Sequence, residues 1–301
     1  MDASQSTHHV FVFIPALFVV VGISLYTGFQ FVTIGLYRRR EPLFLIFGVM
    51  CLLAAAFTAS QIAVYRAGTP GEMIAALRQR IATTCTWFPF FFAFVAFYTG
   101  MRSKRLWLML VSAIFLAFIV MNLMLPNTIR LSELTEIRVI QLTWGETLHI
   151  YRGPPSLWGL IYLATDFLIV LWALLRALIL VRNGERVRGA VLGTYCILQF
   201  AAGAYSALFV DLWGFNSFYV DEFAYLSIVL GMSIFLGGEL HSRSVASEKA
   251  IARLSREVAE REMVEKALRD SEEKFRSMVK TAPDFILTLD RKGTVLFINR
   301  T

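Results

Sequence analysis

The sequence predicts an all-α membrane protein, a bundle of seven transmembrane helices that continues into a charged helix. Three observations carry this prediction: an apolar composition, a series of long uncharged stretches, and an abrupt change of composition near residue 240. The 301 residues are 57% hydrophobic and 17% charged, whereas soluble domains average about 45–50% and about 25%. This balance argues against a soluble enzyme and against extended disorder.

The predicted crossings follow from length and hydropathy. A helix needs about 20 apolar residues to cross the roughly 30 Å hydrocarbon core of a bilayer. Stretches that meet or approach this length are 10–37, 42–65, 81–101, 106–125, 156–175, 189–210 and 223–238. The fifth is interrupted by Asp166, and the seventh is the shortest.

Basic residues predict the orientation of the bundle, because Lys and Arg in short loops stay on the cytoplasmic side. They follow the first, third and fifth crossings, as Arg38–Arg40, Arg102–Arg105 and Arg182–Arg188. We therefore expect the N-terminus outside and the C-terminus inside. Arg66, Arg78 and Arg80 dilute this bias, although Arg78 and Arg80 fit an amphipathic extension of the third helix. The net charge of +7 is spread over such clusters, so no nucleic-acid partner is predicted.

The long connection 127–155 predicts a small external β-hairpin. It contains two strand-like runs, 138–142 and 147–151, with Trp144 in the turn between them. Long structured connections often carry function, so the hairpin is a candidate lid and Trp144 a candidate ligand contact. The alternative is that the hairpin only covers the outer ends of the fourth and fifth helices.

Asp166 is the strongest candidate for a ligand contact inside the membrane. An ionisable side chain at bilayer depth costs at least about 2.5 kcal/mol, so it normally faces the bundle interior with a partner. We expect a pocket in which Asp166 lies near Tyr162, Asn122 or Gln199. The alternative is a hydrogen-bonded clamp between helices, or a protonated carboxyl group.

The aromatic third helix, which includes Trp87, offers a second possible pocket wall, although aromatic packing or contact with lipid is an alternative. Gly189 and Gly193 form a GxxxG pair that indicates a close helix contact. Asp211, Asp221 and Glu222 are expected at the membrane interface, with little bearing on a site. No cofactor or metal site is predicted, because the histidines lie outside the apolar runs and the cysteines are isolated.

Residues 241–279 predict a signalling helix that pairs with a second copy as a coiled coil. The stretch is rich in Glu, Lys, Arg and Ala, and contains neither Pro nor Gly. Its apolar residues partly follow heptad spacing, with a phase break expected near Glu262. The expected contact residues are Ile251, Leu254, Val258, Leu268 and Phe275. A solitary solvated helix is the alternative.

The last residues carry a family resemblance. The segments 271–279, 282–290 and 292–300 include two β-rich runs around Asp290-Arg291-Lys292-Gly293, which predict a hairpin. These segments closely resemble the opening of a PAS domain, which in bacterial sensor proteins follows a coiled coil. The expected organisation is a sensory domain at 1–240, the signalling helix at 241–279, and the start of a truncated PAS domain at 280–301.

The order of these parts is similar to that of bacterial PAS-containing sensor histidine kinases and related diguanylate cyclases. The resemblance implies a homodimeric input module in the bacterial inner membrane, which passes a small-molecule, lipid-like or membrane signal to a PAS domain and an output domain. It places no catalytic residue in this chain. The alternative is a membrane transporter or channel with a regulatory cytoplasmic tail.

Overall fold

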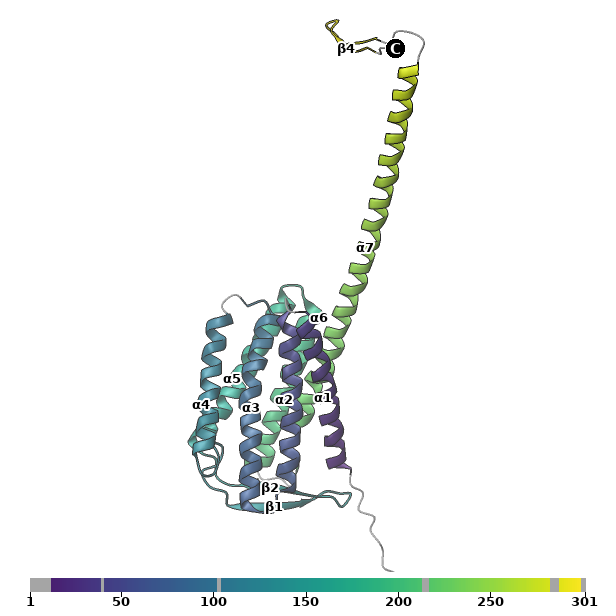
Figure 1. Ribbon diagram of the computed structural model, residues 1–301. Coiled ribbons are helices and arrows are strands. Elements are labelled where there is room, and N and C mark those ends of the chain that lie inside the picture. Colours follow the sequence, from purple (N-terminus) through teal and green to yellow (C-terminus); the bar gives the residue numbers. More distant parts are fainter. Residues whose placement is uncertain (1–11, 39–40, 102–103, 213–216, 282–286, 299–301) are drawn as a thin grey trace, which may run out of the picture. The chain divides into compact units, whose positions relative to one another are not determined.

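A computed structural model describes residues 12–38, 41–101, 104–212, 217–281 and 287–298. Within these ranges, seven helices are long and apolar enough to span a membrane (Figure 1). They are α1 (Phe13–Tyr37), α2 (Pro42–Arg66), α3 (Pro70–Tyr98), α4 (Lys104–Met124), α5 (Leu157–Arg182), α6 (Arg186–Tyr205) and α7 (Asp221–Thr281). A π-helical segment, η1 (Ser206–Leu212), extends α6. The predicted all-α, multi-pass membrane architecture is thus confirmed in its coarse form.

The third helix begins well before its apolar run. Thr69 caps its N-terminus by accepting a hydrogen bond from the Glu72 backbone N–H, and the Glu72 carboxylate accepts one from the Thr69 N–H in return. Pro70 occupies the first turn, where its missing N–H costs nothing. Arg78 and Arg80 consequently lie inside α3, as the predicted amphipathic extension requires.

Glycines bring α1 and α2 into close contact. An ideal Cβ built on Gly48 of α2 would lie 2.6 Å from the backbone N of Val32, and one on Gly35 of α1 would lie 2.6 Å from the backbone N of Leu45. Gly189 similarly lets α6 approach α5, since its Cβ would lie 2.7 Å from the Ala177 carbonyl oxygen. The close contact predicted from Gly189 therefore exists within the chain.

We expect Gly48→Ala to destabilise the bundle by about 1–3 kcal/mol, because the added methyl group would force α1 and α2 apart. Thermal unfolding in detergent measures this loss. Gly22→Ala on α1 is the matched control, since its Cβ would meet nothing within 4 Å. Equal melting temperatures for the two variants would contradict this packing.

The outward faces of the bundle are apolar. On α1 and α4, side chains such as Phe18, Phe29, Leu106 and Leu116 are more than half exposed, whereas α3 supplies fully buried core residues such as Phe91 and Phe94. A monomeric soluble protein rarely exposes continuous apolar surface of this kind. The arrangement suits helices that contact lipid on the outside and one another on the inside.

An antiparallel hairpin, β1 (Glu136–Gln141) with β2 (Thr147–Arg152), lies across one end of the helices (Figure 1). It falls within the predicted segment 127–155, with Ile140 opposite Leu148. Both side chains are buried in a cluster with Tyr65 and Leu77 of the helices. The hairpin is thus part of the folded core at this end, which we call the hairpin end.

Glu146, at the hairpin turn, caps the start of α1. Its carboxylate accepts backbone hydrogen bonds from Val12, Phe13 and Ile14 at 3.1, 2.8 and 3.0 Å, and one from Trp144 Nε1 at 3.0 Å. These are N–H groups that have no partner within the helix itself. Burial raises the pKa of Glu146, but the hydrogen bonds from Ile14, Phe13, Trp144 and Val12 outweigh it and lower the pKa overall.

We expect Glu146→Gln to lower the free energy of unfolding by about 1–3 kcal/mol, because an amide replaces a charged acceptor. A depressed folded-state pKa gives stability that is fully present above the unfolded value of about 4.3 and lost as the pH falls through the folded value. The melting temperature of the wild type should therefore drop below about pH 4 more steeply than that of the variant. Glu133→Gln, at an exposed residue of the same connection, is the control. Parallel pH profiles for wild type and Glu146→Gln would contradict this role.

The chain divides into two compact units, Met1–Phe235 and Leu236–Thr301. In the second unit, α7 is charged, and ion pairs with i,i+4 spacing join Arg243 to Glu239 and Arg261 to Glu257. The predicted contact residues are each more than half exposed in the single chain: Ile251, Leu254, Val258, Leu268 and Phe275. Two short strands follow, β3 (Leu287–Leu289) and β4 (Val295–Ile298), which pair antiparallel.

Candidate ligand cavity

A cavity of about 650 Å³ lies at the hairpin end of the first unit. Its walls come from α2, α3, α5, α6, η1 and α7, and from the connection that carries the hairpin. The volume is in the range typical of small-molecule sites, about 300–1,000 Å³. Side chains that line it and bear on its chemistry are Arg80, Arg130, Tyr162, Asp166, Gln199, Asp221 and Tyr225.

A buried ion pair forms one wall of the cavity. Arg80 Nη2 lies 3.0 Å from Asp221 Oδ2, and the Arg80 side chain is only 4% exposed. The Ser206 hydroxyl donates to the other carboxylate oxygen of Asp221 at 3.0 Å. The Arg80 guanidinium also lies 5.2 and 4.9 Å from the ring centroids of Phe57 and Tyr219. The pair joins α3 to the first residue of α7.

The prediction that Asp221 and Glu222 are uninformative interfacial acids is wrong. Asp221 lines the cavity and holds Arg80, and Glu222 is fully buried. Neither carboxylate oxygen of Glu222 has a hydrogen-bond partner among the described residues. The physical reason is the early start of α3, which places Arg80 inside the bundle where it requires an acid. The Asp211 side chain lies outside the described part of the chain.

Three of the predicted ligand residues do line the cavity. Tyr162 and Asp166 lie one turn apart on α5, and Gln199 faces the same space from α6. The Gln199 side-chain oxygen accepts a hydrogen bond from the Tyr195 hydroxyl at 3.4 Å. Asp166 Oδ1 is buried and has no hydrogen-bond partner among the described residues.

The other three predicted residues lie elsewhere. Asn122 is fully buried, donates to the Arg78 carbonyl at 3.0 Å and accepts from the Ile129 N–H at 3.2 Å, so it is a fastener between segments. Trp87 is packed between Phe91 and Tyr225, at centroid distances of 4.9 and 4.8 Å. Trp144 donates to Glu146 at the hairpin turn. None of the three lines the cavity, so they are corrected to packing and positioning roles.

Arg80 and Asp221 are the cavity residues that hydropathy did not reveal. The signal that could have found Arg80 is the capping box at Thr69 and Glu72, which starts the helix early enough to carry Arg80 into the bundle. An arginine there needs a buried partner. The identity of that partner, 141 residues away, is not encoded in any local pattern.

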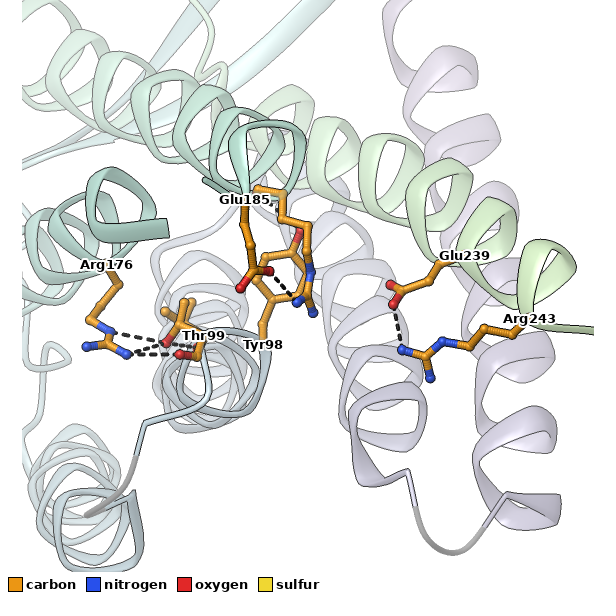
Figure 2. A network of polar contacts seen from close by, with 8 residues as sticks. Tyr98, Thr99, Arg176, Glu185, Glu239 and Arg243 are labelled. Carbon is orange, nitrogen blue, oxygen red and sulfur yellow. Dashed lines mark hydrogen bonds and ion pairs between the residues drawn. The ribbon is translucent and has the colours of Figure 1, made fainter. Parts of the chain in front are cut away.

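The opposite end of the bundle is fastened by polar contacts without a cavity of this kind among the described residues (Figure 2). Arg176 of α5 donates to the hydroxyl and carbonyl oxygens of Thr99, which follows α3. The Tyr98 hydroxyl donates to the Arg188 carbonyl, and Arg188 pairs with Glu185 at 2.6 Å. Several basic residues of this end thus have defined structural partners.

The described residues hold no group of three or more His, Cys, Asp or Glu side chains placed to bind a metal ion. Neither a scan against protein-family models nor a search of curated proteins finds a match to this chain. The cavity is therefore interpreted from its own chemistry: a mostly apolar chamber with one buried ion pair and one unpartnered carboxylate oxygen.

Proposed function

We propose that this chain is the transmembrane input module of a bacterial signal-transduction protein, of the sensor histidine kinase or diguanylate cyclase kind. One observation carries the proposal: Asp221 and Tyr225, in the first two turns of α7, line the cavity, and α7 is a single helix from Asp221 to Thr281. A molecule in the cavity would contact the start of the helix that leads toward the C-terminal segment. No covalent chemistry is needed for this role.

The proposed signal is a shift of α7 between two packings. A ligand that touches the Arg80–Asp221 pair favours one position of α7 over another only if it binds the two with different affinity. A difference of about 1–3 kcal/mol biases the output about 5- to 150-fold. The phase break expected near Glu262 supplies two alternative registers for the paired helices.

The orientation we propose is N-terminus outside, hairpin outside and C-terminus cytoplasmic. Two of the arginines that dilute the charge bias have structural partners: Arg78 donates to the carbonyls of Leu125 and Pro126, and Arg80 pairs with Asp221. They are therefore not free loop charges of the kind that determine topology. Arg39, Arg40 and Arg102, which belong to the basic clusters, lie outside the described residues.

The C-terminal part of the proposal rests on pairing and on the PAS resemblance. The exposed apolar residues of α7, including Ile251, Leu254 and Val258, would be covered by the same residues of a second copy. The strands β3 and β4 fit the opening hairpin of a PAS domain. Residues 282–286 and 299–301, which also carry that resemblance, lie outside the described residues.

The proposal is tested by inserting four residues after Glu248 in a protein that carries the output domain. The insertion should lock or invert the output while the fold of the membrane bundle remains intact. An unchanged response to the stimulus would contradict the proposal.

The alternative function, a transporter or channel, is favoured by one observation: ionisable side chains line a cavity inside the membrane-spanning bundle. Flux through the purified protein in liposomes separates the two functions. The sensor proposal expects no flux above that of protein-free liposomes. Saturable flux that is lost in Asp166→Asn would instead establish transport.

A further inference from the structure

The charged groups around the cavity leave two hydrogen-bonding atoms over. Arg80 uses Nη2 for Asp221, but its Nη1 has no partner among the described residues. Arg130 is already engaged, with its guanidinium 5.8 Å from the ring centroid of Tyr151. Asp166 Oδ1 has no partner either. The site therefore presents one unused cationic donor on α3 and one unused carboxylate acceptor on α5.

Both atoms lie where unmet polar groups are costly. Arg80 is 96% buried, since it is 4% exposed, and the Asp166 oxygen has almost no access to solvent. The surrounding wall is apolar and aromatic, with Phe88, Leu163, Phe167 and Phe200. A buried polar group without a partner is unfavourable, so the site favours a molecule that satisfies both atoms.

We infer that the cavity binds a small zwitterion with an apolar body, whose ammonium group pairs with Asp166 and whose carboxylate accepts from Arg80. A lone amine would leave the Arg80 donor unmet and add positive charge beside Arg80 and Arg130. A lone acid would leave Asp166 unmet and add negative charge near Asp166 and Asp221. A molecule with both groups satisfies the two atoms and leaves the net charge of the site unchanged.

The apolar wall sets the rest of the ligand. A phenyl or branched alkyl group fits against Phe88, Phe167 and Phe200 without unmet polar atoms. Amino acids with apolar side chains have this chemistry, and so do longer amino acids with separated charged groups. The inference deepens the proposed function, because it names the ligand class of the same cavity.

The test uses the whole 301-residue chain in detergent, with binding followed by calorimetry and thermal unfolding. L-Phenylalanine and 6-aminohexanoate are the zwitterionic probes, chosen for short and long separation of the charged groups. Phenylethylamine and 3-phenylpropanoate are matched probes that each lack one charged group. We expect at least one zwitterion to raise the melting temperature and to bind about 10-fold or more tightly than either single-charge probe.

Substitutions at Asp166 assign the site. Asp166→Asn and Asp166→Leu, the second of which is close to isosteric and fully apolar, should each weaken the zwitterion about 10-fold or more. Thr165→Val is the matched control on the same helix, since Thr165 bonds only to Ile161 of its own helix and does not line the cavity. If both zwitterions fail to bind, or a single-charge probe binds as tightly, or both Asp166 variants bind like Thr165→Val, the inference is overturned.

These outcomes are independent of the signalling test. If no zwitterion binds but the insertion after Glu248 inverts the output, the ligand class is wrong and the sensor proposal stands. If a zwitterion binds as expected but the insertion leaves the output unchanged, the cavity assignment stands and signalling through α7 fails.

Discussion

Replacing Asp221 with leucine is expected to destabilise the membrane bundle by about 3–5 kcal/mol. Arg80 is 4% exposed and its Nη2 lies 3.0 Å from Asp221 Oδ2, so the substitution leaves a buried cation without its counter-charge. The Ser206 hydroxyl loses its acceptor at the same time. Unfolding of the purified protein by heat or by SDS in mixed micelles measures the loss.

Two further variants make this prediction specific. Arg80→Leu combined with Asp221→Leu should recover much of the stability, because well-packed apolar residues can replace a buried pair at little cost. Glu239→Gln removes one partner of the exposed pair with Arg243, whose side chain is 53% exposed, and should cost less than about 1 kcal/mol. An Asp221→Leu effect as small as that of Glu239→Gln would show that the Arg80–Asp221 pair does not support the fold.

Inserting four residues after Glu248 is expected to lock or invert the output of a protein that carries the output domain. In a seam that repeats every 3.5 residues, four added residues rotate the following helix by about 50° relative to its partner. Seven added residues restore the seam, so the seven-residue insertion should retain the response. The measured quantity is output activity with and without stimulus.

The pair of insertions distinguishes rotation from simple damage. If both insertions abolish the response, the helix tolerates no change of length and the role of the seam fails. If neither insertion alters the response, no signal passes through this part of α7. The expected difference between four and seven residues is the signature of a helix that acts through its orientation.

Hydropathy was sufficient to predict the helices of the bundle, because crossing a bilayer imposes the same length and apolarity on each of them. Their ends required other physics. The capping box at Thr69 moves the start of α3 to Pro70, ahead of the apolar run at 81. Local alternation also predicted the hairpin, because its strands are adjacent in sequence and one face is buried.

The candidate site was only partly predictable, because its partners are distant in sequence. Asp166, Tyr162 and Gln199 were found as rare polar groups in apolar helices, and they share the cavity. Asn122 carries the same signal but is used up by the backbone groups of Arg78 and Ile129. Contacts such as that of Glu146 with Phe13, separated by 133 residues, have no local sequence signature.

The central claim, that α7 pairs with its twin beyond the membrane, is tested most directly by disulfide cross-linking in native membranes. Cys51, Cys85 and Cys196 are buried and free, so they are first replaced by alanine. Single cysteines are then placed at Leu254 and Val258 on the expected seam, and at Arg256 on the opposite face. The account predicts rapid dimer formation for Leu254→Cys and Val258→Cys and little for Arg256→Cys. Equal cross-linking at all three positions, or at none, would contradict it.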